Sequence, residues 1–223
     1  MTTNSLEFRN IIETLISIFT IEKGQVKVLL FRKKNEPYKG YWVLPGEFLS
    51  INETLEDTIK NAIDDKVGLN NVHLEQTHTY SSLDRTLDDR VLAVSFIGLI
   101  DSKSVEIKRE DKPMYESEWF SIDAVPKMAF DHNVIVADAI YYLRKKIVNS
   151  NVLKSLFPSD FTLPEIQNVY EKILNKQLDR RNFRKKFINL GLIEDTGEMN
   201  EAFNGRPAKL YSFKQEIKER DLF

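Results

Sequence analysis

The densest basic segment of the chain constrains its fold more than any other feature. Residues 178–187 read LDRRNFRKKF, with five arginines and lysines inside seven positions. Phe183, Phe187 and Leu190 recur at spacings of four and three, the period of a helix with one apolar edge. Asp179 stands where an N-cap residue would stand, and Gly191 where a left-handed residue would end the helix. The pattern predicts a short helix over residues 179–190, docked by its aromatic edge and cationic elsewhere.

A second short helix is predicted immediately upstream. Thr162, Pro164 and Glu165 have the spacing of a capping box with proline in the first turn. The apolar residues that follow at helical spacing form one face: Ile166, Val169, Tyr170 and Ile173. Two short helices separated by residues 175–177, the second one basic, are the components of a helix-turn-helix. The alternative is a solvated, charged helix in an ordinary bundle.

The residues after the basic helix favour the helix-turn-helix. Leu192-Ile193 is a short apolar run, and residues 209–213 (KLYSF) alternate like a strand. Residues 196–198 (TGE) and 204–208 (NGRPA) predict turns between them. A hairpin directly after a basic helix is the wing of a winged helix-turn-helix. Arg206 and Lys209 are expected at or beside its tip, within reach of phosphates or a minor groove.

The distribution of charge points to a local contact with DNA. Residues 152–223 hold 13 Lys and Arg against 11 Asp and Glu, whereas the rest of the chain holds 19 against 23. The whole chain is therefore mildly acidic, with its basic residues gathered on one predicted helix. This pattern fits DNA binding through one element better than general binding of polyanions.

Composition excludes several classes of protein. The chain has no cysteine, so disulfides, thiolate metal sites and a cysteine nucleophile are excluded. No run approaches 18 apolar residues, and residues 1–8 lack the apolar core of a signal peptide. We therefore expect a cytoplasmic protein without a membrane partner. The 223 residues have room for one large domain or for a medium and a small one.

The longer N-terminal part has an α+β pattern. Strands are expected over residues 11–20, 26–32, 72–80, 91–100 and 118–120, the first two joined by a hairpin at residues 22–25. Helices are expected over residues 54–67, ended by Gly68, and over residues 133–148. Asn149-Ser150 then predicts a boundary between a domain of residues 1–150 and a domain of residues 151–223.

Residues 40–48 (GYWVLPGEF), the helix over 54–67 and Gly68 together resemble the Nudix hydrolase family. The family signature is G-x5-E-x7-R-E-U-x-E-E-x-G-U, where U is bulky and apolar. When the last glycine is placed on Gly68, the first glycine falls on Glu47 and the first glutamate on Glu53. The three remaining metal-binding glutamates fall on Ala62, Asp65 and Lys66, a lone carboxylate beside a cation. We therefore expect no catalytic residues, no metal ligands and no requirement for Mg²⁺.

The resemblance continues beyond this box. Residues 82–96 (SLDRTLDDRVLAVSF) and 129–133 (AFDHN) resemble ADP-ribose pyrophosphatase-like Nudix proteins, with Arg85 and Arg90 on their two arginines. Thr86-Leu87 replaces the Asp-Pro pair of that subgroup. Residues 161–171, 179–186, 196–198 and 205–211 resemble the Nudix-related transcriptional regulators, which are the NrtR-type repressors of NAD metabolism and their sugar-responsive relatives. The fold implied is an N-terminal Nudix-like α/β/α sandwich with a mixed sheet, followed by a winged helix-turn-helix.

What this resemblance implies is a homodimer that binds a palindromic operator in double-stranded DNA. The Nudix domain of such a repressor senses a small molecule, typically ADP-ribose in the regulators of NAD metabolism, and binds it without a further cofactor. Three alternatives remain: a pentose-responsive regulator on the same scaffold, a residual ADP-ribose pyrophosphatase, and a module whose C-terminal domain contacts protein. Residues 196–198 and 205–208 favour the NAD type.

The candidate effector residues are two aromatics for stacking, three arginines for a diphosphate, and one carboxylate: Arg32, Tyr38, Trp42, Glu53, Arg85 and Arg90. Each has a structural alternative. Trp42 would be core, Tyr38 would cover a turn, and Glu53 would cap a loop. Arg85 and Arg90 would form salt bridges with the aspartates at positions 84, 88 and 89.

The candidate DNA-binding residues fall into two groups. Four lie at the start of the basic helix and are expected to face base edges: Arg180, Arg181, Asn182 and Arg184. Four others are better placed for phosphates: Lys185, Lys186, Arg206 and Lys209. Of the histidines, His73 and His78 are expected on a strand surface. His132 is expected to cap the helix that follows it or to contact a ligand, and the cap is favoured.

Overall fold

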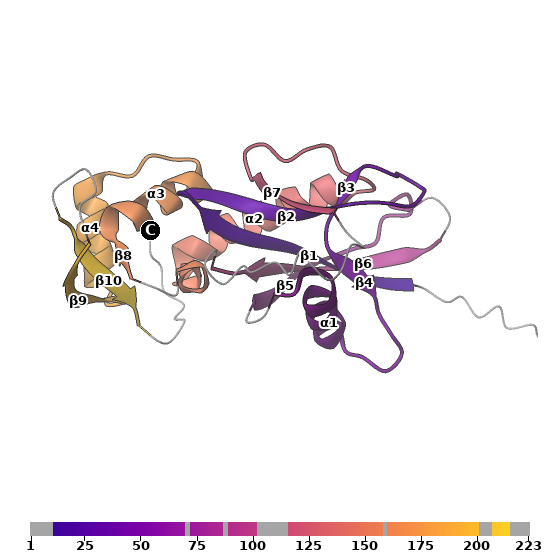
Figure 1. The fold of residues 1–223 in the computed structure, drawn as a ribbon, viewed down its shortest axis with the longest axis horizontal. Coiled ribbons are helices and arrows are strands. Elements are labelled where there is room, and N and C mark those ends of the chain that lie inside the picture. Colours follow the sequence, from indigo (N-terminus) through magenta and orange to yellow (C-terminus); the bar gives the residue numbers. More distant parts are fainter. Residues whose placement is uncertain are drawn as a thin grey trace, which may run out of the picture.

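The computed structural model describes residues 11–69, 72–86, 89–101, 116–157, 160–200 and 207–214. Its elements follow in the order β1 (Ile11–Glu22), β2 (Gln25–Arg32), β3 (Trp42–Val43), β4 (Gly46–Phe48), α1 (Leu55–Val67), β5 (His73–Tyr80), β6 (Val91–Leu99), β7 (Glu116–Ser121), α2 (His132–Asn149), the 3₁₀ helix η2 (Val152–Leu156), β8 (Phe161–Thr162), α3 (Leu163–Leu174), α4 (Arg180–Asn189), β9 (Ile193–Met199) and β10 (Lys209–Phe213). The molecule is elongated, with the larger sheet at one end and α4, β9 and β10 at the other (Figure 1).

The larger part is built on a mixed sheet. Among the described residues this sheet has seven strands, in the order β3-β2-β1-β6-β5, with β4 paired to β1 and β7 to β2. The central strands β1 and β6 run parallel over nine paired positions, and the other pairs are antiparallel. The hairpin expected at residues 22–25 joins β1 to β2, with Lys23 and Gly24 at positive φ. A two-residue turn with both φ values positive matches the twist of the strands it connects.

The period of the strands places one helix on each face of this sheet. In β1 the side chains of Leu15, Phe19 and Ile21 belong to the core under α2, whereas Ile16 and Ile18 belong to the core under α1. Such alternation is what a strand buried on both faces requires. The observed layers are α/β/α, so the predicted mixed α+β fold is confirmed.

The smaller part is a winged helix-turn-helix. Thr162 and Glu165 form the predicted capping box of α3, and Asp179 caps α4 by accepting from the Asn182 amide. Glu171 fixes the turn between the helices by accepting from the Leu178 amide at 2.9 Å. A sheet of order β8-β10-β9, three-stranded within the described residues, packs with these helices. The predicted helices and the wing are therefore confirmed.

One turn of the predicted wing is wrong. Residues 196–198 lie inside β9 rather than at a turn. Gly197 has φ +79° there, and the pairing of β9 with β10 shifts register between Lys209 and Tyr211. A glycine at positive φ serves a β-bulge as well as a turn, which is why the sequence suggested the wrong one.

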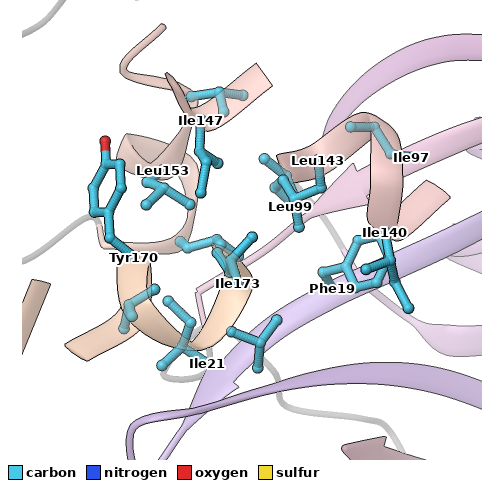
Figure 2. Close-up of a cluster of buried hydrophobic side chains, with 14 of the residues drawn as sticks. Phe19, Ile21, Ile97, Leu99, Ile140, Leu143, Ile147, Leu153, Tyr170 and Ile173 are labelled. Carbon is cyan, nitrogen blue, oxygen red and sulfur yellow. The ribbon is translucent and has the colours of Figure 1, made fainter. Parts of the chain in front are cut away.

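The two parts share one hydrophobic core. Figure 2 shows the side chains that meet between them: Phe19, Ile21, Ile97 and Leu99 from the sheet, Ile140, Leu143 and Ile147 from α2, Leu153 from η2, and Tyr170 and Ile173 from α3. Ser150 and Asn151, at the predicted domain boundary, are fully buried. Two polar contacts cross the same interface. Arg144 donates to the Ile173 carbonyl at 2.7 Å, and Asn168 donates to the Gly24 carbonyl at 3.1 Å.

Among the described residues, no helix combines the length and the apolar character that crossing a membrane requires.

Candidate functional site

The outer face of α4 is the first candidate site. Phe183 and Phe187 are buried and stack with their ring centroids 5.1 Å apart, and Tyr170 of α3 packs against both rings. The polar side chains of α4 from Arg180 to Lys186 are all exposed. Within the described part of the chain, four of them make no hydrogen bond or ion pair: Arg180, Arg181, Arg184 and Lys185. The helix is thus fixed by its aromatic edge and presents cations to an external partner.

The neighbouring strand adds a further cation to this surface. Lys209 of β10 is exposed and contacts Asp195 of β9, with 2.6 Å between Nζ and Oδ2. The hydrogen bond that Lys209 donates to Asp195 raises the pKa of Lys209, so the side chain stays charged at neutral pH. A shallow depression of about 390 Å³ lies along α4, lined by Asn182, Lys185, Lys186, Asn189 and Leu190. Arg206 lies outside the described residues.

The second candidate site is a cavity of about 530 Å³ at the edge of the larger sheet. Its walls come from β1, β2 and the residues after it, β3, β4, the end of α1, and the start of α2 with the residues before it. They are formed by Glu13, Phe31, Lys33, Lys34, Asn35, Val43, Leu44, Gly46, Glu47, Phe48, Lys66, Phe130 and His132. Three lysines, two glutamates and three phenylalanines line one space, which suits a ligand with both an anionic and a ring-containing part.

His132 forms part of the cavity wall and does not cap α2. Its Nδ1 accepts from the Leu44 amide at 3.0 Å, and Asp131 stands at the N-cap position without a side-chain cap. The predicted capping role is therefore wrong. Burial, assisted by the positive charge of Arg85, lowers the pKa of His132 to about 3. The imidazole is neutral at physiological pH and holds the strand end at Leu44 in place.

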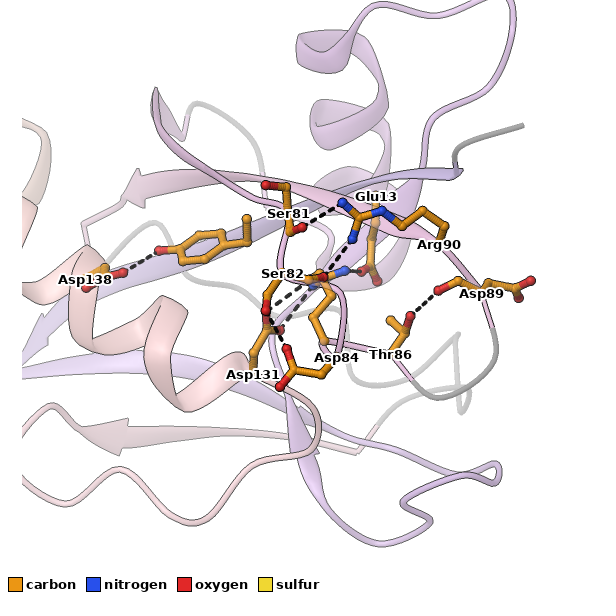
Figure 3. A network of polar contacts seen from close by, with 11 residues as sticks. Glu13, Ser81, Ser82, Asp84, Thr86, Asp89, Arg90, Asp131 and Asp138 are labelled. Carbon is orange, nitrogen blue, oxygen red and sulfur yellow. Dashed lines mark hydrogen bonds and ion pairs between the residues drawn. The ribbon is translucent and has the colours of Figure 1, made fainter. Parts of the chain in front are cut away.

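Arg85 connects Asp131 and Glu13, which Figure 3 shows within one network of polar contacts. It is 5% exposed and donates to both carboxylate oxygens of Asp131, at 3.1 and 3.2 Å. Its Nη1 lies 3.7 Å from Glu13 Oε2. Arg90 instead donates to the carbonyl oxygens of Ser81 and Ser82, at 2.7 and 2.9 Å. Both guanidinium groups are thus engaged within the protein, although not with the aspartates that the sequence suggested.

Comparisons with known proteins identify the family of this chain. Residues 14–139 match the NUDIX domain, and residues 153–213 match the NrtR DNA-binding winged helix domain. The ADPR responsive transcriptional repressor NtrR of Acinetobacter baylyi is 32% identical over 202 residues, covering 89% of this chain and 80% of the relative. The chain belongs to the NrtR family. Its expected resemblance to NrtR-type regulators is confirmed.

Solved structures of NrtR agree with this assignment. Shewanella oneidensis NrtR complexed with a 27mer DNA is 30% identical, with a TM-score of 0.80 over 91% of this chain and 93% of that one. The NUDIX domain of the same protein complexed with ADP ribose is 25% identical, with a TM-score of 0.54 over 60% of this chain and 89% of that one. The NrtR relatives therefore include one bound to DNA and one bound to ADP ribose.

None of the six predicted effector residues lines the cavity of this NrtR-family chain. Arg32 pairs with Glu116 at 3.2 Å and lies over the Trp42 ring, which packs edge-on against Phe120. Glu53 accepts from Thr58 and Asn61, both at 3.0 Å, as a loop cap would. Tyr38 contacts a residue of the cavity wall, because its ring packs against that of Phe130 with the two centroids 4.9 Å apart. Effector binding by these six stays a prediction, and their observed contacts are structural.

The wall residues that sequence reasoning missed come from segments far apart in the chain. Phe130 and His132 were within reach, because residues 129–133 already resembled the ADP-ribose pyrophosphatase subgroup. The φ of +54° at Phe130 is rare for a residue with a side chain, and strained residues of this kind cluster at functional sites in proteins generally. Lys33 and Lys34 follow a buried strand directly. The sequence did not indicate Glu13 as a wall residue, because a single acidic residue in a β-rich run suggests a position at the edge of a sheet.

The degenerate Nudix positions are placed as the alignment implied. Asp65 is exposed, Ala62 is buried, and Lys66 turns toward β4. Among the described residues, no group of three or more His, Cys, Asp or Glu side chains is arranged to hold a metal ion. Ala62 and Lys66 carry no carboxylate, so these positions do not supply the several oxygen ligands that the divalent ion of Nudix hydrolases needs.

Proposed function

We propose that this protein is an ADP-ribose-responsive transcriptional repressor of genes of NAD metabolism, which binds palindromic operator DNA as a homodimer. The observation that carries the proposal is the face of α4. It presents four cationic side chains without intramolecular partners in the described structure, on a helix whose other edge is locked into the core. Unpaired cations on a rigid helix favour a polyanionic partner.

The helix is expected to enter a major groove by its N-terminal half. Arg180, Arg181, Asn182 and Arg184 would then reach base edges, where arginine pairs with guanine and asparagine with adenine. Lys185, Lys186, Arg206 and Lys209 would contact phosphates and fix the register. One short helix per chain offers few base contacts, so specificity is gained by pairing two copies on successive half-sites.

The cavity is the proposed effector site. Lys33, Lys34 and Lys66 supply positive charge for a diphosphate, and Phe130 supplies a ring for stacking. The Acinetobacter relative is an ADPR-responsive repressor, and the Nudix domain of the Shewanella relative has been solved with ADP ribose. An effector that favours one dimer geometry over the other would change DNA affinity by about 1–3 kcal/mol, or roughly 5–150-fold.

The test starts from a site selected by the full-length protein from a random DNA library. Fluorescence anisotropy then measures binding at several salt concentrations, with and without ADP-ribose. We expect a palindromic site, and an apparent affinity that falls at least about fivefold when ADP-ribose is added. Binding that ignores sequence, or an affinity that ADP-ribose leaves unchanged, would contradict the proposal.

Further arms of the same experiment separate the alternatives. Release of DNA by arabinose or another pentose, and not by ADP-ribose, would favour the sugar-responsive regulator. Formation of AMP and ribose 5-phosphate from ADP-ribose and Mg²⁺ would favour the residual hydrolase. Light scattering should give twice the 26.0 kDa of one chain at micromolar concentration. A mass near that of one chain would argue against the dimer.

A further inference from the structure

Lys66 occupies an unusual position for a surface lysine. It lies in the last turn of α1, is 16% exposed, and reaches across to β4. Its Nζ donates to the Gly46 carbonyl and lies 2.8 Å from Glu47 Oε2. Both oxygens belong to the wall of the cavity, and so does Lys66 itself. The ammonium is therefore held at the protein surface of the proposed effector site rather than in solvent.

The oxygens around this ammonium are fixed by the sheet. Gly46 and Glu47 pair with Leu15 and Thr14 of β1, and Thr14 Oγ1 donates to the Glu47 carbonyl at 3.1 Å. A Cβ on Gly46 would approach the Thr14 carbonyl oxygen to 2.3 Å, so only glycine permits this close pairing. The Gly46 carbonyl is therefore held in place whether or not a cation is present, and the Phe48 amide donates to the Glu47 carboxylate beside it at 3.0 Å.

The electrostatics of the cavity depend on the same side chain. Burial alone would raise the pKa of Glu47, but the hydrogen bonds from Lys66 and from the Phe48 amide lower it. Glu13, farther inside, has its pKa raised by burial, and Arg85 and Lys66 oppose that rise. Lys66 thus compensates carboxylates that would otherwise repel an anionic ligand.

Oxygens of this kind, a fixed backbone carbonyl with carboxylates beside it, are what a hard divalent cation binds. In this chain an ammonium already contacts them. We infer that Lys66 is a resident cation, which takes the place of a divalent metal at Gly46 and Glu47 and lets the cavity bind its anionic ligand without metal. The identity of that ligand, a nucleoside diphosphate sugar, rests on the proposed function. The role of Lys66 toward the metal does not.

Mn²⁺ alone tests the role of Lys66 toward the metal. In Lys66→Glu a third carboxylate replaces the ammonium near Glu13 and Glu47. Paramagnetic resonance of free Mn²⁺ should then report binding at least tenfold tighter than that of the wild type. The matched control is Lys60→Glu, which makes the same change of charge on an exposed part of α1 that does not line the cavity. Equal gains in the two variants, or tight Mn²⁺ binding by the wild type, would overturn the inference.

A second variant covers the case in which Lys66→Glu does not fold. Lys66→Met keeps the aliphatic length of the side chain and removes only the charge, so Mn²⁺ should bind it more tightly than it binds the wild type. A Lys66→Met protein that folds and binds Mn²⁺ no better than the wild type would also overturn the inference.

Calorimetry of ADP-ribose binding to the wild type addresses the ligand. The dissociation constant should agree within about twofold in Mg²⁺ and in EDTA, because the resident cation needs no replacement. A tenfold loss of affinity in EDTA would overturn the inference. Failure of ADP-ribose to bind under both conditions, together with a gain of Mn²⁺ binding in Lys66→Glu, would remove the proposed effector and leave the role of Lys66 intact.

Discussion

The two charged regions of this molecule use their cations in opposite ways. In the larger part, Arg85 and Arg90 donate to groups of the same chain, namely Asp131 and the carbonyls of residues 81 and 82. On α4, Arg180, Arg181 and Arg184 have no such partners within the described structure. The same residue type therefore stabilises the fold in one region and is available for an external ligand in the other. The difference lies in burial and in nearby carboxylates, which single-sequence patterns do not reveal.

Arg85→Ala should give the largest effect. It would leave Asp131 and Glu13 partly buried without their cation, and breaking a buried pair from one side costs about 3–5 kcal/mol of unfolding free energy. Urea denaturation checks this value. The control is Arg90→Ala, which should cost less than about 1 kcal/mol, since only exposed hydrogen bonds are lost. An Arg85→Ala protein of normal stability that fails to bind ADP-ribose would show that Arg85 is a ligand residue.

Lowering the pH should reduce the free energy of unfolding, because His132 in the same region gains a proton when the chain unfolds. The folded state lowers the pKa of His132 from 6.5 to about 3, so the unfolded chain binds more protons between these values and stability falls as the pH falls. From pH 6.5 to pH 5 the loss is roughly 2 kcal/mol. His132→Asn, which keeps an acceptor for Leu44, should flatten this dependence in urea titrations. Glu13 has a raised pKa with the opposite effect, but it is common to both proteins. Parallel pH profiles would disprove the role of His132.

The substitutions on α4 should change recognition and leave stability nearly intact. Arg181→Ala and Asn182→Ala are each expected to lose about 1–3 kcal/mol on the selected DNA site, with little change on random DNA. Lys186→Ala should weaken both kinds of DNA alike and reduce the salt dependence by about one unit per half-site. Anisotropy titrations at four salt concentrations distinguish the two classes. If all three variants bind as the wild type does, α4 does not read DNA.

Lys209→Ala should have the smallest effect. The side chain is exposed and its ion-pair partner among the described residues is Asp195, so the thermal midpoint should not change measurably. The salt dependence of DNA binding should still fall by about one unit per half-site if the lysine reaches a phosphate. If the slope is unchanged, Lys209 contributes to the wing fold and does not contact DNA, and the DNA-binding surface is restricted to α4.

The sequence was sufficient for features that a few neighbouring residues determine. The capping box of α3, the glycine that ends α1, the hairpin at residues 22–25 and the aromatic edge of α4 were all confirmed. Each depends on side chains within one or two turns of chain, so spacing alone identifies it. The bulge at Gly197 was misread because a positive φ does not specify its context.

The cavity could not be predicted in the same way. Glu13, Lys33, Glu47, Lys66 and Phe130 come from five segments, and only the sheet topology brings them together. The residues that the sequence favoured were selected by type, as arginines for phosphate and aromatics for stacking. The structure uses most of them to hold loops and strand ends. Residue type suggests a chemistry, whereas the path of the chain decides where that chemistry is accessible.

The buried junction at Ser150 and Asn151 has a consequence for how this architecture can evolve. A chimera that joined the Nudix domain of one relative to the winged helix domain of another at this point would bring together two interface surfaces that had not evolved with each other. Arg144 would need its carbonyl at Ile173, and Asn168 would need the hairpin at Gly24. Substitutions on the exposed side of α4 disturb none of these contacts. New operators are therefore accessible to this lineage by point mutation, whereas a new sensor requires coordinated change across the shared core.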